Sequence, residues 1–583
     1  MKIRNMILTG VCALAAMSCS YLDFDETSGA NNKEAMYATF ANIKNMLTHV
    51  YSYMPQYAGF SSTASVDGMA MRDCASDDAE YGITSATVQN VNNGNWSATN
   101  TYDDAWSLYG GIRAANAFIV DVENVDLSKF FTQGGAFQNQ LKQLEYYPYE
   151  ARVLRATHFF ELARRYGDIA MPTEVLTIDE ANSIGKTSFD DVIKFIVSEC
   201  DECAVHLPVT FQVATLDNAV GRTTKGYALA LKTKALLYAA SPLHNPSNDT
   251  SRWEAVARAA LEVINMKTDN ADPEKVTPVY SLDPAGCFNK VTSSELILAR
   301  MNLAASFYEL YNFPRRFTYG QRSTSLIAAG NYPSQNLVDA FETENGYPVT
   351  LTANGWVCDD PKFDPENPYA NRDPRFARTI LADGMSFKGS TIAVYTDGED
   401  DYTVPQGGSA TGYFVRKYIS DGANFDPEQT GAAASMHHWI IYRYAETLLS
   451  YAEAMVNAFG SGSYKNSEFT LSALDALNQV RANASMPDVE DGTKAELLAK
   501  IQNEWRVEFA FEDHRFWDIR RWKIGDQTTE LAGVNIVRGT DGTKTYRRRT
   551  VENRTWREAM YLYPIPQSEL FKNRNLYPQN PQW

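Results

Sequence analysis

The sequence predicts a mainly α-helical protein made of tetratricopeptide-like helix pairs, with a long, irregular, loop-rich insert that carries short strands. The first observation is that Ala-spaced helical segments are paired around polar turns, as in residues 226–240 and 253–264, although no clean repeat period is present. The second observation is a change of composition. Across residues 267–438, Pro, Gly, Asn and Asp recur every few positions and apolar periodicity is short, which indicates loops with short strands and small helices.

The bulk composition indicates a folded, acidic protein. Of its 583 residues, 44% are hydrophobic and 21% are charged, as in globular chains. The formal net charge of −18 argues against nucleic acid as a partner, because phosphates need a basic protein face. The 33 Tyr and 10 Trp provide many rings. Most of them should pack in the core, and the others suit binding surfaces.

The start of the chain is predicted to be a lipoprotein signal peptide over residues 1–18. Lys2 and Arg4 supply its basic start, and the apolar stretch that follows is too short to span a bilayer. Cys19 follows small residues at the predicted cleavage site and is therefore the predicted lipidated N-terminus, although Ala16 stands where such sites usually carry Leu. Ordinary cleavage nearby is the alternative. The full predicted division is a signal peptide (1–18), a tether (19–34), an N-terminal helical region (35–266), the insert (267–438), C-terminal helices (439–525), and a hairpin excursion with the C-terminal segment (526–583).

The N-terminal helical region is predicted to contain one long polar loop. A first helix is expected over residues 35–54, where apolar residues recur at helical spacing until Pro55 ends it. Residues 56–101 are polar and rich in Asn, and a loop of that length in a compact domain is usually functional. The further helices are predicted over residues 102–119, over 150–173, from Ser188 onward, over 226–240 and over 253–264.

The C-terminal helices are predicted to include one helix that is buried on several sides. A pair is expected over residues 440–459 and 471–484. Residues 503–522 (NEWRVEFAFEDHRFWDIRRW) contain no Gly or Pro and repeat large apolar side chains at helical spacing, which predicts a single helix. A solvated amphipathic helix is the alternative. The expected ion pairs, each three residues apart, are Glu512–Arg515 and Asp518–Arg521.

A β-hairpin is predicted over residues 526–549. The turn is expected at Asp541–Gly542, since Asp-Gly is typical of tight hairpin turns.

The sequence shows no constellation that would indicate an enzyme. The HExxH, GxSxG and GxGxxG motifs are missing, and the seven His are scattered. The CxxC of Cys200 and Cys203 falls within a predicted helix, so we interpret both as core thiols. The acidic run at 397–401 carries oxygens that suit Ca²⁺, but it lacks the EF-hand spacing and a solvated loop is preferred. We therefore expect no catalysis and no cofactor, with a structural Ca²⁺ as the alternative.

Four segments resemble the SusD/RagB family of nutrient-binding outer-membrane lipoproteins from Bacteroidetes-type bacteria. They are YDDAWSLYGGIRAANAFI (102–119), EARVLRATHFFELARRYGDIAMPT (150–173), NEWRVEFAFEDHRFWDIRRW (503–522) and YLYPIPQSELFKNRNLYPQNPQW (561–583). The resemblance implies that the helix pairs form a helical half and that the insert carries the ligand-binding part. YLDFDET (21–27) also resembles the acidic signal by which such proteins reach the cell surface, although it lacks the Pro that often follows.

The resemblance implies a non-catalytic protein that binds oligosaccharides or polysaccharides at the cell surface. It would deliver them to a SusC-like TonB-dependent transporter of the outer membrane. A peptide-binding, RagB-like uptake protein is the alternative, and a surface glycoside hydrolase is less favoured.

By the same resemblance, aromatic rings in the loops form an arc that sugars stack on, with polar side chains beside it. The residues implied as platforms are Trp96, Tyr308 and Trp356. Their implied polar partners are Arg72, Asp73 and Arg316. For each of the six, the alternative is a role in packing or loop structure.

Overall fold

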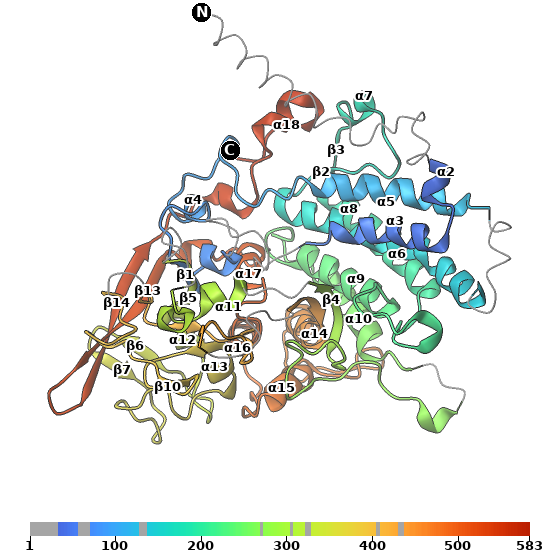
Figure 1. Cartoon of the computed structure of the whole chain (residues 1–583). Helices are drawn as coiled ribbons and strands as arrows, with labels where there is room; N and C mark the ends of the chain where they lie inside the picture. Colours follow the sequence, from blue (N-terminus) through green and yellow to red (C-terminus); the bar gives the residue numbers. More distant parts are fainter. Residues whose placement is uncertain are drawn as a thin grey trace, which may run out of the picture.

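The computed structural model describes most of the chain and confirms a mainly α-helical fold with short strands (Figure 1). The described residues are 33–55, 70–126, 137–268, 272–302, 307–320, 328–403, 408–428 and 437–583. The predicted signal peptide, Cys19 and nearly all of the predicted tether lie outside them. Among the described helices, none combines the length and the apolar character needed to cross a bilayer.

The helices of the N-terminal region pack one on the next. Helix α5 packs on α6, α6 on α8, α8 on α9, and α9 on α10. Helix α10 in turn packs on α14 of the C-terminal region, so the helical part is a continuous stack (Figure 1). The Ser188 side chain caps α8 by accepting a hydrogen bond from the backbone N–H of Asp191, which fixes the start of the helix that was predicted from Ser188 onward. The helices of this region are α2 (Lys33–Met36), α3 (Phe40–Ser52), α4 (Gln89–Asn92), α5 (Leu108–Glu123), α6 (Phe137–Tyr166), α7 (Ile178–Ala181), α8 (Phe189–His206), α9 (Lys225–Ala240) and α10 (Thr250–Ile264).

The C-terminal helices differ from the prediction in one strand. Residues 438–443 form β12 (His438–Arg443), antiparallel to β4 (Leu296–Met301), so the helix predicted to begin at residue 440 begins later. Every residue of β12 is buried, and a short, fully buried strand has no alternation that would distinguish it from a helix. The helices that follow are α14 (Tyr444–Phe459), α15 (Ala473–Asn483), α16 (Lys494–Glu508), α17 (Arg515–Arg521) and α18 (Gln567–Lys572).

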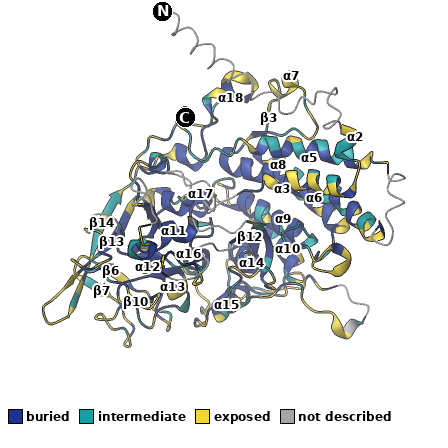
Figure 2. Cartoon of the chain, viewed as in Figure 1, coloured by how far each residue is buried: buried dark blue, intermediate teal, exposed yellow. Residues whose placement is uncertain are grey.

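The predicted single helix over residues 503–522 is wrong, because the chain leaves the helix between α16 and α17. Phe511 and Asp513 have φ angles of 60° and 66°, in the left-handed region that bulky residues rarely adopt. The aromatic faces of both helices are nonetheless buried, as Figure 2 shows around α16 and α17. The stretch is therefore divided between the end of α16 and the short, buried helix α17.

Buried ion pairs between distant segments explain this break. Glu512 accepts hydrogen bonds from Arg443 at 2.8 Å and from Lys417 at 2.6 Å, whereas Arg515 binds Asp77 at 2.8 Å. The predicted Glu512–Arg515 pair is therefore wrong. The predicted Asp518–Arg521 pair is confirmed at 2.6 Å. The three-residue spacing correctly predicted the Asp518–Arg521 pair, which lies within one helix. It could not predict the ion pairs of Glu512 and Arg515, whose partners are far away in the sequence.

The insert consists of small two-stranded sheets and short helices laid against the helical stack (Figure 1). All the strand pairs of the described chain are antiparallel. Strands of the insert and its neighbours are β1 (Ala79–Tyr81), β5 (Asn331–Pro333), β6 (Thr350–Thr352), β7 (Gly355–Val357), β8 (Ile380–Leu381), β9 (Ser386–Phe387), β10 (Ser390–Thr391) and β11 (Phe414–Val415), and its helices are α11 (Phe307–Asn312), α12 (Gln335–Ala340) and α13 (Pro374–Thr379).

The predicted hairpin is confirmed and is longer than expected. β13 (Glu530–Arg538) pairs with β14 (Lys544–Asn553), and Gly542 lies in its turn with φ of 88°. The hairpin projects from the side of the insert (Figure 1).

We expect Glu512→Gln to destabilise the fold by about 3–5 kcal/mol, because it leaves the buried cations of Arg443 and Lys417 without their shared carboxylate. Urea unfolding followed by circular dichroism measures this change. Glu254→Gln is the matched control, since Glu254 pairs with Arg258 at an exposed i,i+4 position and should change stability by less than about 1 kcal/mol. Equal effects of the two substitutions would contradict the assigned role of Glu512.

Candidate functional site

Two of the three predicted platform rings are buried. Trp96 is 1% exposed and packs edge-on against Tyr563 at 4.6 Å and Trp583 at 5.2 Å between ring centroids. Tyr308 is 2% exposed, and its hydroxyl donates to the carbonyl oxygen of Lys417 at 3.0 Å. A ring enclosed on both faces has no surface left for a sugar. The prediction that these two rings are exposed platforms is therefore wrong for this structure, and the packing alternative holds.

The predicted polar partners Arg72 and Asp73 are buried as well and link distant segments. Arg72 holds Asp103 through two hydrogen bonds of 2.6 Å and reaches Asp513 at 2.7 Å. Asp73 accepts the backbone N–H of Phe511 at 3.1 Å. Both contacts tie the turn η1 (Arg72–Ala75) to the break between α16 and α17. Their role is to fix that break, so the prediction that they contact a ligand is wrong for this structure.

Asp73 titrates far from its ordinary range. Burial, together with the nearby carboxylates of Asp78 and Asp513, raises the pKa of Asp73 from 3.8 to about 8. Its second carboxylate oxygen has no hydrogen-bond partner among the described residues. Near neutral pH the folded protein therefore favours the protonated, neutral form of this side chain.

We expect Asp73→Asn to stabilise the protein increasingly as the pH rises from about 4 to about 8. In this window the folded state keeps a proton that unfolded Asp73 releases, so the wild type loses stability as the pH increases. The asparagine oxygen can still accept from Phe511. The free energy of unfolding of the variant relative to wild type should rise by at least about 1 kcal/mol across the window.

Asp77→Asn is the control for this measurement, because Asp77 is ionised and pairs with Arg506 and Arg515. This substitution should destabilise the fold at neutral pH. A pH-independent difference between Asp73→Asn and wild type would show that Asp73 is ionised in the folded state.

Trp356 and Arg316 keep partial exposure. Trp356, on β7, is half-buried and packs against the rings of Tyr369 at 5.9 Å and Tyr546 at 6.1 Å. The Arg316 side chain is 24% exposed. Its guanidinium donates to Asp400 at 3.0 Å and to Ser390 at 2.8 Å, and lies 4.4 Å from the Phe317 ring centroid. The structure does not gather the six predicted residues at one place.

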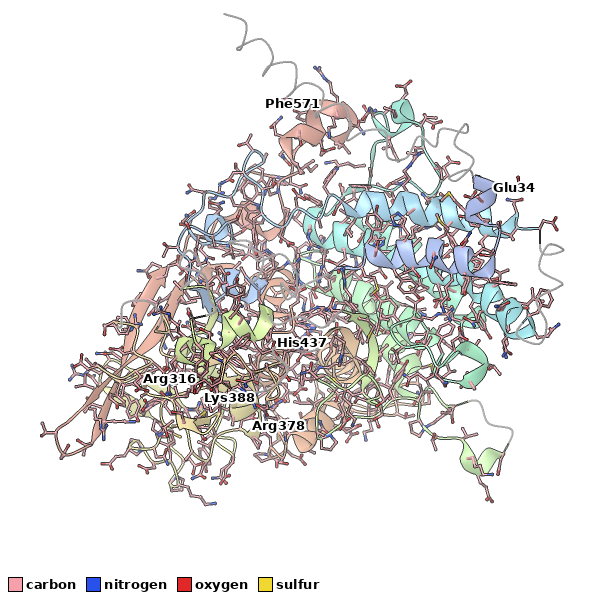
Figure 3. The ribbon with its side chains drawn as sticks, in the orientation of Figure 1. Glu34, Arg316, Arg378, Lys388, His437 and Phe571 are labelled. Atoms are coloured by element: carbon pink, nitrogen blue, oxygen red, sulfur yellow. The ribbon has the colours of Figure 1, made fainter. Side chains whose placement is uncertain are left out.

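A surface around Arg316 has the exposed rings that the predicted arc lacks. Tyr319 follows the turn η6 (Arg315–Thr318) and is 50% exposed, and Tyr402 is 44% exposed. Arg549 lies over the ring of Tyr402, 4.1 Å from its centroid. The carboxylate of Glu399 forms an ion pair with Arg316 at 3.0 Å, and the Glu399 side chain stays largely exposed. We call these five residues, Arg316, Tyr319, Glu399, Tyr402 and Arg549, the Arg316 surface; Figure 3 labels Arg316 at its place in the insert.

The backbone presents Tyr319 outward at a local conformational cost. Its φ is 48°, and Gly320 follows with φ of 74°. A bulky residue in the left-handed region costs about 1–3 kcal/mol, and such strain is concentrated at functional sites. A sequence signal was present for both tyrosines. Each stands beside turn-forming residues, in RRFTYG and in GEDDYTVPQGG, and turns lie at the surface, where regular structure does not enclose a ring.

The acidic run at residues 397–401 is engaged by protein groups. Asp400 binds Arg316 and also accepts the backbone N–H of Ala393 at 2.9 Å, and Asp401 accepts from Thr403 at 2.5 Å. Within the described ranges, no group of three or more His, Cys, Asp or Glu is placed to hold a metal ion. A structural Ca²⁺ stays a prediction. The Cys200 and Cys203 thiols are buried and not joined to each other.

Comparison with known proteins gives the family. Residues 295–583 match the sequence model of the SusD family. SusD-like protein P2 of Formosa agariphila is 22% identical over 98% of both chains, and SusD-like protein P25 of the same organism is 21% identical over 90% of both. A SusD-like protein from Bacteroides fragilis has a structure similar to this one, with a TM-score of 0.72 and 25% identity over 94% of this chain and 98% of that one.

Two further similar structures belong to proteins that are named for the ligand they bind. A SusD-like carbohydrate-binding protein from B. fragilis gives a TM-score of 0.70 at 25% identity, covering 93% of this chain and 100% of that one. A laminarin-binding SusD-like protein gives 0.57 at 22% identity, covering 93% and 99%. The chain belongs to the SusD/RagB family.

Proposed function

We propose that this protein is a non-catalytic glycan-binding lipoprotein on the outer face of the outer membrane, and that the Arg316 surface contacts the glycan. The family membership and the carbohydrate-binding and laminarin-binding relatives support the ligand class. The observation that carries the site is the pair of exposed tyrosines: Tyr319 directly follows the turn that carries Arg316, and Tyr402 lies under Arg549, three residues after the Glu399 that pairs with Arg316.

The chemistry of these residues suits a sugar. Tyr319 and Tyr402 offer apolar ring faces to the C–H faces of a pyranose, and their hydroxyls stay in contact with water. Arg316 and Glu399 offer a donor and an acceptor of hydrogen bonds to sugar hydroxyls. The guanidinium of Arg549 stacks on the ring of Tyr402 and holds that ring in place. The surface is therefore arranged before the ligand arrives, which lowers the entropy lost on binding.

The same contacts support binding without catalysis. Retaining and inverting glycosidases need two carboxyl groups that are available to the bond being cleaved. Here the carboxylates of Glu399 and Asp400 are both paired with Arg316. Asp400 is buried and also accepts the backbone N–H of Ala393, so it is not available as an acid or a base, and the exposed Glu399 can accept from a sugar hydroxyl but has no second carboxyl group within the Arg316 surface to work with.

In this proposal a lipid at Cys19 anchors the chain, and the partner is a SusC-like TonB-dependent transporter. A shallow glycan site binds weakly, so tethering next to the transporter raises the effective concentration of captured glycan at its entrance.

We expect Tyr319→Ala and Tyr402→Ala each to weaken glycan binding about ten-fold, because each removes one stacking ring. Calorimetry with defined malto-, laminari-, xylo- and manno-oligosaccharides measures the affinity, with tri- to hexapeptides as a parallel arm. Tyr319→Phe keeps the ring and should bind almost as well as wild type. Tyr347→Ala, which removes a ring of similar exposure outside the Arg316 surface, is the second control.

Unchanged affinity in both alanine variants would place the site elsewhere. Binding of peptides alone would indicate the RagB-like function instead, and new reducing ends after incubation with polysaccharide would indicate a hydrolase.

We expect Cys19→Ala to release the protein from the membrane, because it removes the predicted site of lipidation. Fractionation of cells labelled with a palmitate analogue measures both lipid attachment and location. Cys358→Ala, which removes another thiol, is the control and should leave the protein in the membrane fraction. Lipid labelling of Cys19→Ala would contradict the predicted anchor.

A further inference from the structure

A cavity lies away from the Arg316 surface, between α5, the segment that follows β2 (Ile169–Ala170), α7 and α18. Its volume is about 340 Å³, at the lower end of the range for small-ligand pockets. In Figure 3, Phe571 of α18 marks this part of the molecule, whereas Arg316 lies in the insert. None of the residues predicted from the sequence lines this cavity.

Side chains brace the walls of this cavity by bonding to backbone carbonyls. Arg113 of α5 donates to the carbonyl of Leu176 at 2.6 Å. Asn116, one helical turn further on, donates to the carbonyls of Pro172 at 3.1 Å and Glu174 at 2.9 Å. On the far side, Asn573 donates to the carbonyl of Ile184 at 2.8 Å. Three segments without regular structure are thus fixed around an open space, so the cavity is formed before any ligand binds.

The cavity has an aromatic wall. Trp106 and Tyr109 lie with their ring centroids 5.0 Å apart, tilted by 56°. Tyr166 packs edge-on against Trp106 at 5.4 Å, and the Tyr109 hydroxyl donates to the carbonyl of Ala170 at 3.1 Å, which fixes both rings. Trp106 is only half-buried, and its indole N–H has no hydrogen-bond partner among the described residues. The wall therefore offers a ring face together with an available donor.

The rim of the cavity is polar and its charges balance. Arg113 and Lys572 are basic, and Glu174 and Glu569 are acidic. Lys572 pairs with Glu569 at 2.8 Å. Arg113 uses one nitrogen on Leu176, so the remaining N–H groups of its guanidinium are available. A balanced rim gives no electrostatic preference for an acidic ligand or for a cation.

We propose that this cavity is a second saccharide site, which takes the end of a neutral oligosaccharide with one sugar ring stacked on Trp106. The inference rests on the proposed function. Arg113 and the Trp106 indole would donate to sugar hydroxyls, and the carboxylate of Glu174 and the amide of Asn182, both exposed on the rim, would bind them from the other side. Two separate sites would let one chain hold a long glycan at two points, or two glycans at once.

The test uses the full-length protein carrying Tyr319→Ala and Tyr402→Ala, so that the Arg316 surface no longer contributes. Calorimetry with the same neutral hexasaccharides measures the binding that remains. Adding Trp106→Ala should reduce the remaining affinity at least ten-fold, and adding Trp106→Phe, which keeps a ring, should reduce it less. Adding Glu174→Gln together with Asn182→Ala should also weaken it ten-fold. Asp179→Asn, on α7 but outside the cavity, is the matched control.

Thermal unfolding of each variant shows whether it is folded. Glu174 and Asn182 are exposed, so the effect of substituting them on affinity does not depend on the packing of Trp106. Absence of saccharide binding by the wild-type protein would overturn both the proposed function and the second site. Wild-type binding that is lost completely in the Tyr319→Ala/Tyr402→Ala protein would overturn only the second site. Remaining affinity that is insensitive to the wall and rim variants, or a cavity that takes peptides and no saccharide, would overturn it as well.

Discussion

The arrangement of the molecule depends on a buried group of ion pairs centred on Arg443. Its guanidinium binds Glu295 and Glu508, each at 2.6 Å, and Glu512 at 2.8 Å. Lys417 also binds Glu512, at 2.6 Å. Burial opposes the ionisation of Glu508, but Arg443 and Arg375 outweigh it and lower the pKa of Glu508 to about 2. Glu508 is thus ionised throughout the physiological range, and the ion pairs around Arg443 join the insert to the C-terminal helices.

This connection explains how irregular segments can present a defined surface. Short two-stranded sheets are marginally stable alone, and the buried apolar residues of the insert belong to the same hydrophobic core as those of the helices. Lys417 anchors the insert to the end of α16 and to the break after it, and Glu295 anchors it to Arg443 of β12. Arg375 adds a further link, through hydrogen bonds to Glu504 and Glu508. With the base of the insert held in this way, the turn that carries Arg316 and Tyr319 occupies a fixed position relative to the helices.

Sequence reasoning predicted the helices well and the site poorly, for one physical reason. A helix is encoded in residues that are close in sequence, so periodicity and capping locate α8, α9 and α10. Burial of a single ring depends on segments hundreds of residues away. Trp96 is enclosed by Tyr563 and Trp583, which no local pattern around Trp96 could indicate. The break at Phe511 has the same origin, because the partners of Glu512 and Arg515 come from the insert, from β12 and from the first polar loop.

A crystal structure of the protein with a bound neutral hexasaccharide tests the central claim most directly. The account predicts a sugar ring in contact with Tyr319 or Tyr402, hydrogen bonds from Arg316 or Glu399 to its hydroxyls, and unchanged contacts around Arg443. Sugar bound only after the insert has moved away from the helices, with the ion pairs of Arg443 broken and Trp96 or Tyr308 exposed to the ligand, would contradict it.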